Sequence, residues 1–453
     1  MIWWLGFKYG LTLTFLAGAF TLEAAEPETF TKEEAIEYAL ENNTEVLNAE
    51  LETRIAEHQM RETRSTGLPQ LDSDFSMDYL ADRPVQVFPV GDFPILPPGV
   101  DEEDELEVSF GRDYDFTGAA TLSQLIFDGE YFVALQASRQ FRELKAEELE
   151  EQRREVREDV SKAFLRTVQA RQSKDILEDN IAQLQETLEE TEAMYENGFV
   201  EKLDVDRVQL RLNQVRSSHR DAERQHKNAL EGLKIQMGYP VEAEIQTEKD
   251  LQDYREDEGI QMRPIQEVYQ ERIEREVMKS REELTALDRR RFQAGYLPTL
   301  SGVVRHTRNA QREAFDVLDQ DGNWFSSTTF GLTINIPIFD GFRKNAQINQ
   351  KELELKQLRN QRHLLEESIQ AELNEAANNY QSAVEQLEDQ RQNRRLAEDI
   401  YEQTLERYRE GVGESMDVTE AQTDLNEAEM NELSALLDVL VAQMEYEIAS
   451  GQF

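Results

Sequence analysis

The side chains whose type and spacing are best suited to chemistry are carboxylates, which recur in two copies of one short motif. Residues 195–209 read YENGFVEKLDVDRVQ and residues 408–422 read YREGVGESMDVTEAQ, so Tyr, Gly, Glu, Asp, Val and Gln recur 213 positions apart. A glycine between polar neighbours lets one helix end and the next begin, because it can adopt a left-handed conformation. Asp204 and Asp417 then fall in the first turn of the following helix, where unpaired N–H groups favour an anion. Each copy therefore predicts the tip of a helical hairpin that carries an acidic residue.

Other side chains that could do chemistry form no recognisable site. The chain contains no cysteine, which excludes disulfides, cysteine metal sites, thiol catalysis and a lipid-modified N-terminal cysteine. His219 and His226 lie seven positions apart on one predicted helix face, which favours a solvated pair over a metal site. The five histidines show no ligand spacing; they are His58, His219, His226, His306 and His363. We therefore expect no enzyme activity, no metal site and no cofactor.

The excess of acidic over basic residues excludes some classes of binding partner. The chain has 453 residues, of which 49 are basic and 93 acidic, giving a formal net charge of −44. Nucleic acids and anionic membrane surfaces require a basic face, so neither is expected as a partner. The composition, 31% charged and 39% hydrophobic, fits a highly solvated exterior.

Residues 1–25 have the pattern of a secretory signal peptide. Lys8 supplies a positive charge, residues 9–20 (YGLTLTFLAGAF) form a short apolar run, and small residues such as Ala24 and Ala25 offer a cleavage site. A retained membrane anchor is the alternative interpretation. No later run reaches the roughly 18 apolar residues of a spanning helix. An exported chain of this kind is periplasmic, secreted or a membrane barrel.

Long amphipathic helices dominate the rest of the chain. Thr31 and Glu34 form a capping box at the start of a helix expected over residues 31–64. A second helix, expected over 128–197, has apolar residues spaced by threes, fours and sevens, as in coiled coils. At 1.5 Å per residue its length is roughly 100 Å, too long for the interior of a globule. A returning helix is expected over 203–237.

Four stretches predict strands, at about residues 69–80, 116–127, 299–308 and 325–338. In the first, apolar residues occupy most odd positions and acidic residues or serine the even ones, which is typical of a strand with one apolar face. The segment 81–115 is rich in Pro, Gly and acidic residues, and we interpret it as a long exposed loop.

The chain is predicted to be an internal duplication. Residues 26–240 form the first repeat, with the order helix, strand, loop, strand, long helix, tip, helix, and residues 264–453 form the second. Ile126-Phe-Asp-Gly129 recurs as Ile338-Phe-Asp-Gly341. The second repeat begins with a helix over 264–294. It also contains one long helix that ends at residue 410 and another helix over 415–448. Residues 241–263 are interpreted as an acidic connector.

The strands favour a β-barrel that forms when chains assemble around an axis. Two strands cannot stand alone, and four still leave open edges. A closed barrel places apolar faces against lipid and polar faces against water. Trp324 and Phe325 would suit an interfacial aromatic girdle. A small soluble sheet capping a helical bundle is the alternative. The predicted fold class is mainly α, with long antiparallel coiled-coil helices and a β-barrel contribution.

In its motifs the sequence resembles the TolC-like outer-membrane efflux protein family. The resemblance covers nearly all of the mature chain and is carried by residues 30–43 (FTKEEAIEYALENN), Gly67-Leu-Pro69, residues 122–129 (LSQLIFDG), residues 336–341 (IPIFDG) and the two Gly-x₅-Asp-Val tips. It implies a homotrimer in the outer membrane, with an α-helical barrel that forms a tunnel through the periplasm. It also implies a twelve-stranded β-barrel, four strands per chain, in contact with outer-membrane lipid. The implied partners are a periplasmic adaptor (membrane fusion) protein and an inner-membrane pump or ABC exporter.

The resemblance implies a gate where the helical hairpins close the tunnel. Asp417 matches a constricting aspartate, and Glu420 a second acidic position one turn further on. Tyr408 matches an aromatic residue of the closed state. Asp204 matches an acidic residue that pairs with a basic residue of the second hairpin, but that basic position is Gly413 here. A latch built on that ion pair is therefore not expected in the same form.

The hairpin tips would be the adaptor-docking edge. The matching positions are Gly198, Phe199, Val200, Gly411, Val412 and Gly413. Threefold symmetry would gather Asp417 and Glu420 into a strongly negative constriction that favours cations. The sequence thus predicts a passive exit duct of a tripartite efflux pump or a type I secretion system. The alternative is an exported structural coiled-coil protein without channel activity, which leaves the strands without a purpose.

Overall fold

The computed structural model describes residues 28–89, 105–255, 260–315 and 323–452. The predicted signal peptide lies outside these residues. The chain forms two compact units, which we call the tip unit and the sheet unit. Among the described residues, the tip unit consists of segments 28–39, 159–255 and 390–437, and the sheet unit of segments 40–89, 105–158, 260–315, 323–389 and 438–452.

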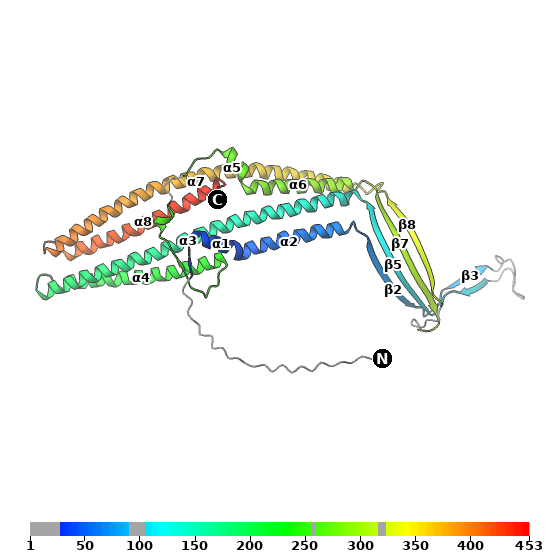
Figure 1. Ribbon diagram of the computed structural model, residues 1–453, viewed down its shortest axis with the longest axis horizontal. Coiled ribbons are helices and arrows are strands. Elements are labelled where there is room, and N and C mark those ends of the chain that lie inside the picture. The colour runs from blue at the N-terminus through cyan, green and yellow to red at the C-terminus, as the bar shows by residue number, and fades with distance from the viewer. Residues whose placement is uncertain (1–27, 90–104, 256–259, 316–322, 453) are drawn as a thin grey trace, which may run out of the picture. The chain divides into compact units, whose positions relative to one another are not determined.

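The helices follow the same order in each half of the chain, a helical pair before two strands and a long helical hairpin after them (Figure 1). Both tips of the hairpins belong to the tip unit. The helices are α1 (Lys32–Asn42), α2 (Thr44–Ser65), α3 (Gly129–Glu196), α4 (Lys202–Met237), α5 (Ile265–Glu271), α6 (Ile273–Ala294), α7 (Arg343–Arg409) and α8 (Ser415–Ala449).

Two helices that the sequence predicts as continuous are each broken by one residue. The helix expected over 31–64 is divided at Asn43, whose extended backbone and side-chain oxygen cap the N–H groups of Glu45 and Val46. The helix expected over 264–294 is divided at Arg272, which also has an extended backbone. Asparagine competes for backbone N–H groups, so it favours a helix start over a helix interior.

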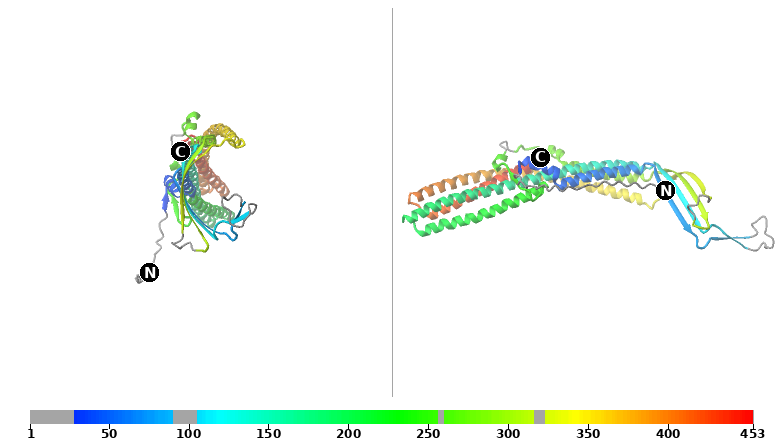
Figure 2. Two further views of the ribbon diagram at one scale, coloured as in Figure 1. Left: turned by 90° about the vertical axis from the view of Figure 1, so that its right-hand side faces the viewer. Right: turned by 60° about the horizontal axis from the view of Figure 1, so that its bottom comes forward.

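Four strands of the sheet unit form one antiparallel sheet in the order β2-β5-β7-β8. Figure 2 shows that this sheet is twisted and curved. The strand expected at 325–338 ends at Asn335, just before the segment with Pro337, which lacks an N–H for the ladder. The strands are β2 (Gln70–Tyr79), β5 (Tyr114–Phe127), β7 (Thr299–Arg312) and β8 (Phe325–Asn335).

Two segments interpreted as irregular contain further strands. In the expected loop over 81–115, β3 (Val85–Pro89) pairs with β4 (Glu105–Ser109) as an antiparallel hairpin. Valines alternating with glutamine in β3 are a strand pattern that the acidic and proline-rich context concealed. In the expected connector over 241–263, β6 (Ile245–Thr247) pairs in parallel with β1 (Glu28–Phe30), and a 3₁₀ helix covers Leu251–Tyr254. The connector therefore pairs through β6 with β1, the first strand of the described residues.

The register of the sheet gathers apolar side chains on one face and polar side chains on the other. Leu71, Leu122, Val304 and Phe330 lie at one level across the four strands, and Asp72, Thr121, Arg305 and Thr329 lie at the next. Since successive residues point to opposite sides, the sheet has an apolar face and a polar face. The apolar face carries exposed Leu71, Phe75, Met77, Tyr79, Leu122, Phe330, Leu332 and Ile334. The polar face carries Asp72, Asp74, Ser76, Asp78, Thr117, Thr121, Arg305, Thr307, Asn309, Ser327 and Thr329.

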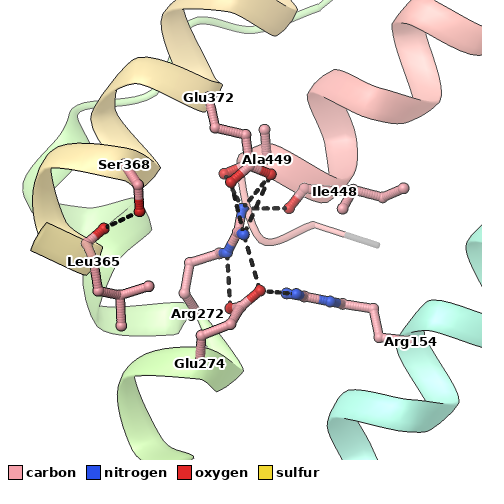
Figure 3. Close-up of polar contacts among 8 residues, drawn as sticks. All are labelled: Arg154, Arg272, Glu274, Leu365, Ser368, Glu372, Ile448 and Ala449. Carbon is pink, nitrogen blue, oxygen red and sulfur yellow. Dashed lines mark hydrogen bonds and ion pairs between the residues drawn. The ribbon is translucent and has the colours of Figure 1, made fainter. Parts of the chain in front are cut away.

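A buried ionic cluster holds the helices of the sheet unit together where α5 meets α6 (Figure 3). The Arg272 side chain is 5% exposed and donates hydrogen bonds to Glu274, to Glu372 and to the carbonyl oxygens of Ile448 and Ala449. Those two carbonyls belong to the C-terminal end of α8, where unpaired carbonyl oxygens favour a cation. The Arg272 side chain, at the break between α5 and α6, thus caps the C-terminal end of α8.

Candidate functional site

The two hairpin tips of the tip unit share one backbone geometry. Gly198 and Gly411 both have φ of 77°. The residue after each glycine donates its N–H to a carbonyl five residues back, Phe199 to Met194 at 2.9 Å and Val412 to Arg407 at 3.0 Å. This hydrogen bond, with the glycine in the left-handed region, is a Schellman-type helix end. The repeated glycine motif therefore forms equivalent turns.

Gly413 lies in a position that leaves little room for a side chain. A Cβ atom there would be 3.0 Å from the Tyr408 backbone nitrogen and 3.3 Å from the Arg407 carbonyl carbon. The Gly413 N–H also donates to the Arg407 carbonyl oxygen at 3.1 Å. Because the crowding atoms are backbone, a larger residue requires the turn itself to shift. The absence of a basic residue here therefore has a steric reason.

Asp204 links the first tip to the second through a hydroxyl group. One of its oxygens accepts the Glu201 N–H at 3.0 Å and caps α4, as the sequence predicted for a helix-start anion. The other oxygen accepts a short hydrogen bond from the Ser415 hydroxyl, at the start of α8. Ser415 is 1% exposed. The partner of Asp204 in the second hairpin is thus Ser415, a residue that the sequence did not single out.

Tyr408 is buried between the hairpins rather than exposed at the tip. Its ring packs in a cluster with Tyr401, Val418, Ala421 and Leu425, against Met194 and Val200. Its hydroxyl donates a hydrogen bond of 3.0 Å to Thr191 of α3. Burial raises the pKa of this hydroxyl above its ordinary value, so Tyr408 stays a neutral donor.

Further from the tip, an amide network joins α3 to α8. Gln422 is 1% exposed and donates hydrogen bonds to the side-chain oxygens of Asn180, at 3.0 Å, and Gln183, at 3.3 Å. Asn180 donates in turn to Asn426 at 2.7 Å. These amide groups bond to one another across the two hairpins and so help to specify how the hairpins align, although Gln422 Oε1 has no hydrogen-bond partner among the described residues. Gln422 belongs to the repeated motif, but no role was predicted for it from that motif.

Asp417 and Glu420 lie on the exposed face of α8. Two further acidic residues, Asp424 and Glu427, are also exposed and continue this face. The spacing of three and four residues places all four on one stripe of the helix. The adjacent stripe, offset by one residue or about 100° around the helix, contains Val418, Ala421, Leu425 and Ala428 and is buried. The sequence prediction named only Asp417 and Glu420. Following the helical spacing along α8 would also have identified Asp424 and Glu427 on the same face.

A groove of about 430 Å³ lies between α4 and α8. Glu420 lines it from α8, and Arg207 and Arg211 line it from α4. Asp417 does not line this groove, so the two acidic residues have different surroundings. At the tips themselves, Phe199 is 78% and Val412 66% exposed. The structure thus presents one large apolar side chain on each turn.

The comparison with protein-family models matches this chain to the outer membrane efflux protein family over residues 35–238 and 287–451. The chain belongs to that family. No curated protein matches it.

Solved structures share the fold at low sequence identity. A structure of CusC, described in terms of conformational changes accompanying folding and transmembrane channel formation, has a TM-score of 0.72 at 16% identity, covering 92% of this chain and 91% of that chain. The CmeC outer membrane channel of Campylobacter jejuni has a TM-score of 0.71 at 17% identity, with coverages of 93% and 86%. The outer membrane protein VceC of Vibrio cholerae has a TM-score of 0.68 at 15% identity, with coverages of 93% and 96%.

Family and fold together confirm the predicted class, an outer-membrane protein that is mainly helical and contributes strands to a β-barrel. No helix of the described residues combines the length and the apolarity needed to cross a bilayer. Within the same residues, no group of three or more His, Asp or Glu side chains is arranged to hold a metal ion.

Proposed function

We propose that this chain forms, as a homotrimer, the passive exit duct of a tripartite efflux pump or a type I secretion system. The partners would be a periplasmic adaptor protein and an inner-membrane pump or ABC exporter. The duct performs no chemistry, and the partner pump supplies the energy and selects the cargo.

The two-faced sheet with open edges carries this proposal. β2 and β8 are the edge strands of a four-stranded sheet, and Phe75 and Phe330 on its apolar face are 65% and 77% exposed. Three copies joined edge to edge would give twelve strands, remove the edges, turn the apolar face to lipid and line the lumen with the polar face. An exported structural coiled coil would leave this apolar face in water.

The hairpin tips supply the gate in this proposal. Asp417 and Glu420, repeated by threefold symmetry, would form a negatively charged constriction, with Asp424 and Glu427 extending it along α8. Asp204 and Tyr408 would hold the two hairpins of one chain together through their hydrogen bonds to Ser415 and Thr191. The gate would thus combine these hydrogen bonds within a chain with acidic rings between chains.

The turns at the tips would be the adaptor-docking edge. Exposed Phe199 and Val412 offer apolar contact points on these turns. The proposed docking set is Gly198, Phe199, Val200, Gly411, Val412 and Gly413.

Single-channel recording in planar bilayers tests this function. We expect the wild type to show a low conductance that favours cations. The double variant Asp417→Asn/Glu420→Gln should show clearly weaker cation selectivity, because the charge of the constriction is removed while its size is kept.

The matched control is Asp221→Asn, which removes an exposed carboxylate from α4 that pairs with Arg224. It should leave selectivity unchanged. Unaltered selectivity in the double variant would refute the gate assignment, and the absence of any conductance in the wild type would refute the duct itself.

A further inference from the structure

The apolar face of the sheet carries an arginine and a histidine on one central strand. His306 and Arg308 of β7 lie on the same face as Val304, because successive residues alternate between faces. On the neighbouring strands they stand level with Ala120 and Gly118 of β5 and with Thr328 and Ser326 of β8. Charged residues are rare on a lipid-facing surface, because charge in the hydrocarbon region is costly.

These side chains line a groove of about 330 Å³ that has both apolar and polar walls. Its residues on the apolar face are Ser73, Phe75, Gly118, Ala120, His306 and Arg308, with Trp324 at the side. Asp74 and Ala119 also border it, but their side chains belong to the polar face. Gly118 and Ala120 leave space above β5, so the groove is open to a ligand that lies against the sheet.

Aromatic and hydroxyl partners hold Arg308 and His306 in place. The Arg308 guanidinium lies over the Trp324 ring, with its carbon 5.7 Å from the ring centroid. His306 Nδ1 lies 2.8 Å from the Thr328 hydroxyl oxygen. Within the described residues, no ion pair to a carboxylate neutralises Arg308. With respect to the described residues, its N–H groups are therefore available for an anion.

The height of the groove fits the border of a bilayer. Arg308 is eight residues beyond Leu300, which lies near the helix end of β7. For strands tilted by about 40°, eight residues correspond to about 20 Å along the membrane normal, against an apolar band about 25 Å tall. With Leu300 taken as the start of this band, Arg308 stands in the part of the band that is distant from the helices, from which its long side chain can reach the headgroups on that side.

We propose that His306, Arg308 and Trp324 bind the phosphate of an anionic lipid headgroup in the leaflet distant from the helices. Arg308 would donate to the phosphate oxygens, Trp324 would lie at the interface, and Gly118 and Ala120 would leave room for an acyl chain against the sheet. The occupant is a lipid and not free phosphate, because the groove opens from an apolar face. The proposal rests on the outer-membrane location and not on the export role.

Native mass spectrometry of the full-length protein in mild detergent tests the proposal, with diphosphoryl lipid A, zwitterionic phosphatidylcholine and inorganic phosphate as probes. We expect preferential binding of diphosphoryl lipid A, weakened about fivefold in Arg308→Ala, since one basic side chain near a membrane surface contributes about that factor. The matched control is Arg305→Ala, which removes an arginine from the same strand on the polar face. It should bind like the wild type.

Equal binding by Arg308→Ala and the wild type, or equal losses in Arg308→Ala and Arg305→Ala, would overturn the proposal. So would inorganic phosphate that displaces the lipid, because the site would then recognise free anions. If Arg308→Ala does not assemble, Arg308→Gln keeps the length of the side chain and should show the same loss. Conductance of these variants is measured in parallel, so a failed duct and a failed lipid site give different results.

Discussion

At the scale of single residues, the tips replace an ion pair with a hydroxyl contact. Resemblance to the family implied a basic partner for Asp204 at position 413, where the chain has glycine. The backbone crowding around Gly413 explains why a long side chain is disfavoured there, and the Ser415 hydroxyl occupies the acceptor that such a residue would use. A hydroxyl donor to a carboxylate is a charge-assisted hydrogen bond, so the link between the hairpins is retained in another chemical form.

Removing this hydroxyl should loosen the proposed gate. We expect Ser415→Ala to shift the closed-to-open equilibrium by about tenfold, because a buried hydrogen bond to a charged group contributes roughly 1.5 kcal/mol. The measurement is the open probability in planar bilayers. Thr419→Ala is the control, since the Thr419 hydroxyl donates only within α8, to the Met416 carbonyl at 2.9 Å. An open probability that rises equally in both variants would contradict a specific role for Ser415.

The sequence was informative about which tip residues matter and less so about what each one contacts. Glycines with a left-handed conformation and acidic residues at helix starts follow from local rules, and Gly198, Gly411 and Asp204 obey them. The contacts of Asp204 with Ser415 and of Tyr408 with Thr191 join segments more than 200 positions apart. Such pairings depend on how two helical hairpins align, which no local pattern specifies.

At the scale of elements, the breaks within the predicted helices have different physical causes. Asn43 caps its own helix, a signal present in the sequence but outweighed by strong helical periodicity on both sides. Arg272 has no local signal, because its extended backbone accompanies tertiary bonds to α7 and to the end of α8. The first break was therefore predictable from local chemistry, and the second required the fold.

The Arg272 cluster should contribute strongly to stability. Removing one member of a buried charge pair costs about 3 kcal/mol, because the remaining charge is left without its partner. We expect Arg272→Met to lower the thermal melting temperature, measured by circular dichroism in detergent, far more than Arg281→Met. Arg281 pairs with Glu148 at the surface, where such a pair contributes at most about 1 kcal/mol. Equal decreases in the two variants would contradict the cluster's role.

The same cluster predicts a dependence of stability on pH. Burial acts to raise the pKa of Glu274, but hydrogen bonds and charge from Arg272 and Arg154 outweigh it and hold this pKa below the ordinary value of 4.5. A lowered folded-state pKa stabilises the fold above the unfolded value, and this contribution disappears as pH falls through the folded value. Melting temperatures of the wild type should therefore fall in acid.

The variant Glu274→Gln separates this effect from general acid denaturation. It should be less stable than the wild type at neutral pH and should lose less stability on acidification. Glu283→Gln, an exposed neighbour on α6, is expected to follow the wild-type pH profile. Parallel profiles for wild type and Glu274→Gln would show that Glu274 does not carry the pH dependence.

At the scale of the whole molecule, the sheet defines how copies should join. Period-2 alternation predicted two faces for each strand separately, and the register aligns those faces across all four strands. The strand order could not be predicted from the sequence, because β5 pairs with β7 across a separation of nearly 200 residues. That order leaves β2 and β8 as edges, so in the proposed trimer β8 of one copy pairs with β2 of the next.

Cysteine cross-linking tests this edge pairing directly, because the natural chain contains no cysteine. Ser327→Cys on β8 is combined in turn with a cysteine at each of four positions on the same polar face of β2, namely Asp72, Asp74, Ser76 and Asp78. At least one combination should give covalent dimers and trimers on oxidation, since disulfides form only between closely placed Cβ atoms. The control pair Ala119→Cys/Thr307→Cys lies directly opposite within one chain and should give a monomer. If none of the combinations yields covalent oligomers while the control oxidises, the β8-to-β2 trimer is wrong.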